Sequence, residues 1–379
     1  MRVLQVYKDY DPPVKGGIEG HINLLANGLV RRKVDVHVLV SNTCTSTETI
    51  REGAVPLTKA GQWGRFASAP LNPAFPLHLK RLSRGMDIVH FHYPNPTGEI
   101  SALAAGLSPP LVVTYHSDIV RQKRLKMVYQ PFMNLFFNRV QAIIATSPNY
   151  LNSSPVLCRY RQKCTVIPLG VDSGRAPALG PGTHDDGRTP EILFIGRFRY
   201  YKGLHVLIRA MGRVAGAKLV LVGRGPLERD LRRAVAEQGL SSKIEFLGEL
   251  THAELIRRIQ LCSLLVLPSV ERSEAFGIVL MEAMLCGKAV ISTELGTGTS
   301  FVNQHGVTGL VVPPDDPPAL AEAINYLTAH PRKCREMGVC ARQRILGNFT
   351  ADKMVARTHR LYRTVLKTVL KTESSKMES

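Results

Sequence analysis

The chain has 379 residues and a formal charge of +19, a length for which two domains are expected. Apolar residues make up 44% of the chain and charged residues 21%, a composition that excludes a disordered chain. The basic excess favours partners that carry phosphate: a nucleic acid, an anionic membrane surface or a phosphorylated small molecule.

The cysteines and the hydropathy pattern bear on the compartment. Seven cysteines are scattered without a CxxC pair, which indicates reduced thiols in the cytoplasm. No stretch approaches the roughly 20 apolar residues that span a bilayer, and we see no apolar segment of signal-peptide length at the start. We therefore expect a cytoplasmic protein, either free or lying on the inner face of the cytoplasmic membrane.

Short apolar segments alternate with helical patterns in the first half of the chain. The expected strands are Val3–Tyr7, Val34–Val40, Asp87–His92, Leu111–Tyr115 and Ala142–Ala145, with a helical pattern over Ile22–Leu29. His21 stands just before this helix, where we expect an exposed side chain. The alternation predicts a parallel sheet covered on both faces by helices.

The same alternation returns after residues 171–187, whose glycines, prolines and aspartates suit a linker. Expected strands follow at Ile192–Ile195, Leu219–Val222, Ile244–Leu247, Leu264–Leu267 and Ala289–Ser292, with helices over Leu227–Gln238 and Ile278–Cys286. The sequence thus predicts an α/β fold with domains at 1–170 and 188–350. Residues 351–371 form an amphipathic helix expected to pack on the first domain, and 372–379 are a polar tail.

Two glutamates flank the start of the helix expected at Ile278. Glu274 comes just before Phe276, Gly277 and Ile278, and Glu282 stands two turns inside the helix. Free amides at a helix start can meet phosphate or sugar oxygens, and a nearby carboxylate can accept hydrogen bonds from hydroxyls. A pair of glutamates on a solvated helix face is the alternative.

Cations and glycines stand at comparable places after other strands. Arg197 and Lys202 lie in FIGRFRYYKG, directly after an apolar strand, where they suit a phosphate group better than an ordinary surface position. Gly16 and Gly17 follow the first strand, where a turn or a close approach of backbone to phosphate is expected.

Together these motifs resemble retaining glycosyltransferase family 4, whose GT-B fold has two Rossmann-like domains with parallel sheets that face each other across a cleft. The Glu274–Glu282 segment is similar to the family's E-x7-E motif, FIGRFRYYKG to its G-R-x5-K-G element, and Gly16-Gly17 to its glycine loop. The segment LVLVGRGPLERDL is similar to the strand, glycine turn and helix that follow. The resemblance covers nearly the whole chain.

The resemblance implies roles for named residues. His116, Arg197, Lys202 and Glu274 are the expected catalytic residues, with Asp118 near enough to orient His116. The expected donor-binding residues are Gly16, Gly17, Arg197, Lys202, Glu274, Phe276, Gly277, Ile278 and Glu282. No metal ligand and no cofactor are expected, because Arg197 and Lys202 can stabilise a departing diphosphate by themselves.

The substrates follow from a narrower resemblance. Many family members carry a GG-x-x-E pattern where this chain has the loop Glu294–Asn303, and the variant resembles bacterial enzymes that build O-antigen and related polysaccharides. This similarity implies a GDP-mannose or GDP-rhamnose donor, a glycan or lipid-linked acceptor and a role in lipopolysaccharide biosynthesis; a UDP-hexose donor is the alternative. For the loop itself, a plain turn and a substrate contact both stay open.

Three further alternatives remain, and the first two concern the basic charge. Ile119–Asn138 combines Arg121, Lys123, Arg124 and Lys126 with an apolar half, which suits contact with anionic lipid headgroups or, equally, a solvated face beside a core helix. A basic nucleic-acid-binding protein is a second class of function, although the chain lacks the usual motifs of one. A non-hydrolysing sugar-nucleotide epimerase would share the fold but not these motifs.

Overall fold

The computed structural model contains two compact units, one formed by Met1–Gly170 with Ala351–Ser379 and the other by Val171–Thr350. It describes the chain except residues 13, 15, 68, 121–122, 176–188 and 378–379, and at 123, 124, 126, 175 and 372–377 it describes the backbone alone. Most of the linker expected at 171–187 therefore lies outside the described residues, as do the side chains of the tail at 372–379. The described helices include none long and apolar enough to cross a membrane.

The first unit is built on an eight-stranded sheet in the order β10-β9-β8-β7-β1-β2-β4-β3, parallel except for the β3–β4 pair. Its strands are β1 (Arg2–Val6), β2 (Asp35–Ser41), β3 (Glu48–Glu52), β4 (Val55–Ala60), β7 (Ile88–Tyr93), β8 (Leu111–Tyr115), β9 (Ala142–Ala145) and β10 (Cys164–Val166). A separate hairpin pairs β5 (Gly64–Phe66) with β6 (Ala69–Leu71). The helices are α1 (Gly17–Arg31), α2 (Phe75–Ser83), α3 (Pro96–Ala105), α4 (Lys123–Arg139), α5 (Pro148–Ser153), α6 (Pro155–Arg159) and α14 (Ala351–Met377), with a 3-10 turn at Arg161–Lys163.

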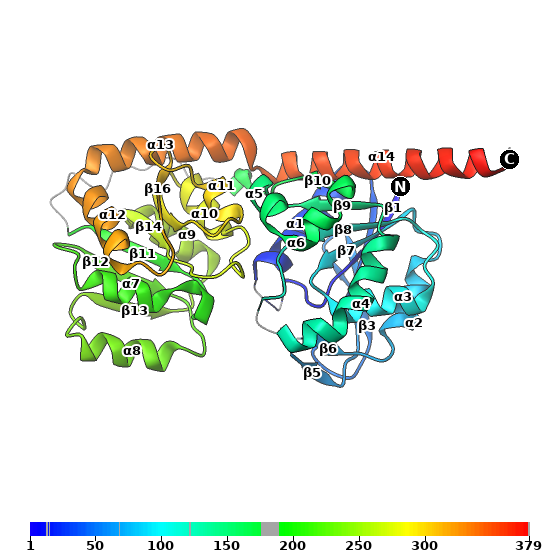
Figure 1. Cartoon of the computed structure of the whole chain (residues 1–379), viewed down its shortest axis with the longest axis horizontal. Helices are drawn as coiled ribbons and strands as arrows, with labels where there is room; N and C mark the ends of the chain where they lie inside the picture. Colours follow the sequence, from blue (N-terminus) through cyan, green and yellow to red (C-terminus); the bar gives the residue numbers. More distant parts are fainter. Residues whose placement is uncertain (13, 15, 68, 121–122, 176–188, 378–379) are drawn as a thin grey trace. The chain divides into compact units, whose positions relative to one another are not determined.

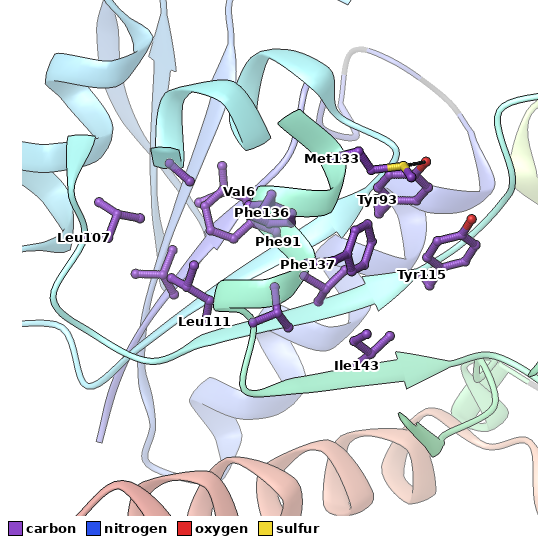
Figure 2. Close-up of a cluster of buried hydrophobic side chains, with 14 of the residues drawn as sticks. Val6, Phe91, Tyr93, Leu107, Leu111, Tyr115, Met133, Phe136, Phe137 and Ile143 are labelled. Carbon is purple, nitrogen blue, oxygen red and sulfur yellow. Dashed lines mark hydrogen bonds between the residues drawn. The ribbon is translucent and has the colours of Figure 1, made fainter. Parts of the chain in front are cut away.

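Alternate residues of these strands enter two separate cores, because successive side chains of a strand point to opposite faces of the sheet. On one face Val6, Phe91 and Tyr115 meet α2, α3 and α4. Figure 2 shows this aromatic cluster, in which the Tyr93 hydroxyl donates to Met133 Sδ at 3.2 Å. On the other face Val3, Val38 and neighbouring residues meet α1 and α14.

The C-terminal helix α14 returns to the first unit and packs against α1, as its apolar stripe predicts (Figure 1). Met354, Val355 and Val365 are buried there. A Cβ atom on Gly28 would come within 2.4 Å of Val355 Cγ2, so the two helices approach closely at this glycine.

The second unit carries a six-stranded parallel sheet in the order β13-β12-β11-β14-β15-β16. Its strands are β11 (Glu191–Ile195), β12 (Lys218–Val222), β13 (Ile244–Gly248), β14 (Leu264–Leu267), β15 (Ala289–Thr293) and β16 (Gly309–Val312). Its helices are α7 (Leu204–Met211), α8 (Glu228–Glu237), α9 (His252–Leu261), α10 (Ile278–Leu285), α11 (Gly298–Val302), α12 (Pro317–Ala329) and α13 (Pro331–Asn348), with 3-10 turns at Ser173–Arg175 and Tyr200–Lys202. These two parallel sheets confirm the predicted α/β class.

Candidate functional site

The strand order of the second unit marks where a ligand is expected. The chain runs outward from β11 to β12 and β13, then crosses to β14 on the other side of β11. In open parallel sheets, ligands bind beyond the carboxyl ends of the strands at this kind of switch point. Arg197 and Lys202 follow β11 and Glu274 follows β14, so the topology brings the predicted residues to one edge.

Lys202 and Glu274 form an ion pair at this edge. Lys202 Nζ lies 2.5 Å from Glu274 Oε2, and the two side chains are only 13% and 10% exposed. Ser269 Oγ donates to the same carboxylate oxygen at 3.1 Å. Burial, the largest single influence, would lower the pKa of Lys202, but the charge of Glu274, the neighbouring Tyr201 and the hydrogen bond to Glu274 together raise it, so the lysine stays charged.

Arg197 differs from Lys202 in its surroundings. Its side chain is exposed, and the described part of the chain gives it no ion pair. Its full charge is therefore available to an anionic ligand, in a guanidinium fork that matches two phosphate oxygens.

Close backbone contacts hold the loops that carry these charges. Gly203 adopts a φ of +66°, and a Cβ atom there would lie 1.9 Å from the carbonyl oxygen of Pro268 in the loop after β14. The Val270 amide donates to the carbonyl of Tyr201 at 2.8 Å. Only glycine permits both this conformation and this approach, which fixes Lys202 beside the loop that leads to Glu274.

The start of α10 follows Glu274 directly. Gly277 precedes the helix with a φ of +77°, Phe276 is buried, and no side chain among the described residues caps the helix. The first amides, beginning with that of Ile278, are thus left for ligand oxygens. Glu282 lies in the second turn, where burial raises the pKa of its carboxyl to about 7.

The loop Glu294–Asn303 braces this segment, a role that the sequence did not single out. The buried Thr297 donates through Oγ1 to the carbonyl of Glu274 at 2.8 Å, and the Gly298 amide donates to the carbonyl of Ala275 at 2.7 Å. Because a Cβ atom on Gly298 would lie 2.4 Å from Phe276 Cδ2, the glycine permits close packing. The run GTGTS was the feature of the sequence that could have indicated this role. Its residues Thr297 and Gly298 hold the backbone of the segment that carries Glu274.

Gly16 and Gly17 belong to the first unit, where Gly17 begins α1 and Gly16 is its extended N-cap residue. Both are exposed. A Cβ atom on Gly16 would lie 2.2 Å from Glu19 Oε2 of the same helix, so this position favours a residue without a side chain.

His116 follows β8 in the same unit and is buried, at 3% exposure. Its Nε2 hydrogen-bonds with Nδ1 of His92 at 3.0 Å, whereas the carboxylate of Asp118 accepts hydrogen bonds from the hydroxyls of Tyr115 and Ser154. The expectation that His21 is exposed is wrong. Helix α1 begins four residues before His21, which therefore lies inside the helix and is 5% exposed. The centroid of its ring is 5.1 Å from that of His116.

Comparisons with known proteins identify the family of the chain. The family model described as "Glycosyltransferase Family 4" matches residues 15–175, and the model "Glycosyl transferases group 1" matches residues 183–344. The O-antigen chain mannosyltransferase C of Escherichia coli is 39% identical over 97% of this chain and 99% of its own length. The D-rhamnosyltransferase WbpZ of Pseudomonas aeruginosa is also 39% identical, over 93% of each chain.

Among solved structures, sucrose-phosphate synthase from Thermosynechococcus elongatus superposes with a TM-score of 0.81 at 22% identity, covering 97% of this chain and 99% of that one. This likeness confirms the GT-B fold that the sequence motifs predict. With two matching family models, a related fold and relatives 39% identical over nearly their whole length, the chain belongs to glycosyltransferase family 4.

Proposed function

We propose that this glycosyltransferase moves a hexose from a nucleotide-diphosphate sugar to a glycan or lipid-linked acceptor, with retention of the anomeric configuration and without a metal ion. The observation that carries the proposal is the Lys202–Glu274 pair at the switch point of the second sheet. An ammonium group has three N–H donors, and only one is needed for Glu274. The others can donate to the diphosphate.

The charges suit a departing diphosphate. Cleavage of the anomeric bond increases negative charge on the leaving group, which Arg197 can hold with its fork and Lys202 as a point charge. Glu274 already accepts hydrogen bonds from Lys202 and Ser269 through one oxygen, and its other oxygen makes no hydrogen bond with the described residues. This arrangement supports a role in holding a sugar hydroxyl rather than in forming a covalent intermediate.

We infer a GDP-linked donor of the mannose type, either GDP-mannose or GDP-rhamnose, used in cell-surface polysaccharide biosynthesis. The inference is supported by two relatives at the same identity, one named a mannosyltransferase of the O-antigen chain and the other a D-rhamnosyltransferase. Rhamnose is 6-deoxymannose, so the two sugars differ in a single hydroxyl. We assign His116 to that primary hydroxyl and, with Gly16 and Gly17, to the donor site.

A donor panel tests the proposal directly. Purified protein is mixed with GDP-mannose, GDP-rhamnose and UDP-hexoses, and thermal stabilisation and donor hydrolysis are measured. We expect GDP-linked sugars of the mannose type to stabilise the protein most. Stabilisation by UDP-hexoses alone would move the assignment to that class, and stabilisation by no nucleotide or nucleotide sugar at millimolar concentration would refute the donor site.

His116→Gln separates the two sugars. If the imidazole contacts the primary hydroxyl, the variant loses about 10-fold in kcat/KM with GDP-mannose and little with GDP-rhamnose, which lacks the hydrogen-bond partner. An equal loss with both donors contradicts this assignment for His116.

We further propose that α4 contacts an anionic membrane at the inner face of the cytoplasmic membrane, where a lipid-linked acceptor would be found. One face of α4 is buried in the core through Met133, Phe136 and Phe137. The other exposes apolar side chains at 42% to 72%: Leu125, Met127, Val128, Phe132 and Leu135. The side chains of Arg121, Lys123, Arg124 and Lys126 lie outside those described, but the sequence gives this segment four cations in addition to its apolar residues.

Sedimentation with lipid vesicles tests the membrane contact. The protein is expected to sediment with vesicles that contain anionic lipid and not with neutral ones, and Met127→Ser with Val128→Ser should reduce the bound fraction several-fold. Val339→Ser with Leu346→Ser on α13, also exposed, is the matched control. Equal binding by both double variants would refute a role for α4. If nucleic acid displaces the protein from vesicles at low salt but not at higher salt, that binding to nucleic acid reflects the net charge of the protein alone.

A further inference from the structure

Three buried histidines of the first unit lie around one point at the ends of β7 and β8. His21 comes from α1, His92 from β7 and His116 from the residue after β8, and their side chains are at most 5% exposed. One ring nitrogen from each lies within 4.8 Å of the others. Residues far apart in the sequence are thus brought together by the parallel pairing of β7 with β8 and by the helix above them.

The ring nitrogens of this trio have few partners inside the protein. Three of these nitrogens, Nδ1 and Nε2 of His21 and Nε2 of His92, are buried and have no hydrogen-bond partner among the described residues. The only hydrogen bond within the trio joins His92 Nδ1 to His116 Nε2. A buried polar atom without a partner costs free energy, and a group bound by these three nitrogens would offset that cost.

His90 provides the internal contrast. It is fully buried and stacks on His92 with ring centroids 4.6 Å apart, but both its nitrogens are engaged, one with the hydroxyl of Tyr362 and the other with that of Thr114. Burial next to the trio therefore does not by itself leave an imidazole unpartnered. The histidines with open nitrogens are those that converge.

We propose that His21, His92 and His116 bind a divalent transition-metal ion, of the class that prefers imidazole nitrogen, such as Zn²⁺. Three neutral imidazoles are a ligand set that suits this class of ion, and a rearrangement of the rings would bring the nitrogens to Zn–N distances of about 2.0–2.1 Å. No negative ligand is needed in the set. A site with three protein ligands keeps a fourth position for water.

The protonation of the trio fits metal binding. Burial lowers the pKa of His21 to about 4, and burial followed by the neighbouring histidines lowers the pKa of His92 and His116 well below the usual value. The three rings are therefore neutral at pH 7, and no proton has to leave before an ion binds.

The site is distinct from the donor-holding cluster of the second unit. An ion bound by the trio would tie α1, which carries Gly16 and Gly17 at its start, to the two strands and would engage His116. The departing diphosphate stays with Arg197 and Lys202, so the transfer step itself requires no ion at this site.

A metal titration of the full chain, purified without a histidine tag and stripped with a chelator, tests the proposal. We expect Zn²⁺ to bind by calorimetry at one ion per chain, and Co²⁺ to give the visible absorption of a tetrahedral site. At a 100-fold excess over Kd, Zn²⁺ should raise the Tm by about 5–10 °C for a domain of this size. His21→Gln and His92→Gln should each lower the affinity by more than the roughly 10–100-fold that loss of an outer-shell partner costs.

The matched control is His37→Gln, which changes a half-buried histidine of the same unit that hydrogen-bonds to Thr58. It should bind Zn²⁺ like the wild type. Stabilisation of each variant by nucleotide sugar, measured separately, shows that the chain is folded and that the second unit works. No uptake of either metal by the wild type, or undiminished uptake by His21→Gln, would overturn the proposal while leaving the transferase assignment untouched.

Discussion

Replacement of Lys202 by methionine separates its observed pairing with Glu274 from the role that we propose for it, holding the diphosphate. Methionine keeps the length of the side chain but removes its charge, which leaves a carboxylate that is 10% exposed without its cation. Loss of one member of a buried ion pair costs about 3–5 kcal/mol. At roughly 2–4 °C per kcal/mol for a unit of this size, Lys202→Met should lower the Tm by about 6–20 °C.

Activity should fall for a second reason. The leaving diphosphate loses a charge-assisted hydrogen bond, and removal of one such donor typically lowers kcat by about 100- to 1000-fold. Lys218→Met is the control, because Lys218 is an exposed lysine at the opposite end of the sheet, where β12 starts. It should leave both Tm and kcat near the wild-type values.

The double variant Lys202→Met with Glu274→Gln decides between the two tasks. It contains no unpaired carboxylate, so it should regain most of the lost Tm, yet it still lacks the cation and should be much less active than the single variant Glu274→Gln. Steady-state kinetics with the best donor and thermal unfolding are measured on the same preparations. If Tm and kcat recovered together, Lys202 would serve only to neutralise Glu274, and the assignment to the diphosphate would be refuted.

Three further changes probe the same cluster. Burial raises the pKa of Glu282 to about 7, so its contribution to stability is present below about pH 4.5 and is lost as the pH rises through 7. Glu282→Gln should remove this part of the pH dependence of Tm, which is measured from pH 4 to 8. Gly203→Ala should lower the free energy of unfolding by several kcal/mol and remove most of the activity, because its Cβ would meet Pro268. The control Gly216→Ala changes a glycine with a φ of +57° and open space around it, and should lower the free energy of unfolding, measured by chemical denaturation, by only about 1 kcal/mol. Arg197→Ala should leave stability within about 0.5 kcal/mol but weaken nucleoside diphosphate binding at least 10-fold by calorimetry.

The fold class could be read from the sequence because its signal is local. Buried parallel strands are short apolar runs, and those expected at 111–115, 142–145 and 264–267 match β8, β9 and β14 in full. The hairpin of β5 and β6 was missed, since these three-residue strands contain a single buried residue and carry no such run. Strand β10 was missed for the same reason, being three residues long and only partly buried.

The site was predictable as a set of positions and not as a set of contacts. Arg197, Lys202 and Glu274 stand after expected strands, but the pairing of Lys202 with Glu274 joins residues 72 apart and depends on β11 lying next to β14. The order of strands is a property of the whole sheet, and the hydrophobic periodicity of the sequence does not predict it. The same holds for His21, whose burial comes from β7 and β8 rather than from its own helix.

The balance of charge explains why the edge of the second sheet needs two cations. Glu274, whose free oxygen suits a sugar hydroxyl, would repel a diphosphate if it stood alone, and Lys202 cancels that charge through the pair. A site with Lys202 as its only cation would thus be neutral towards the leaving group. Arg197 has no ion pair in the described part of the chain, so in the proposed site it would supply the net positive charge, while Lys202 would share its donors between the two anions. In the function that we propose, the two cations together make sugar recognition by a carboxylate compatible with diphosphate binding at this end of the sheet.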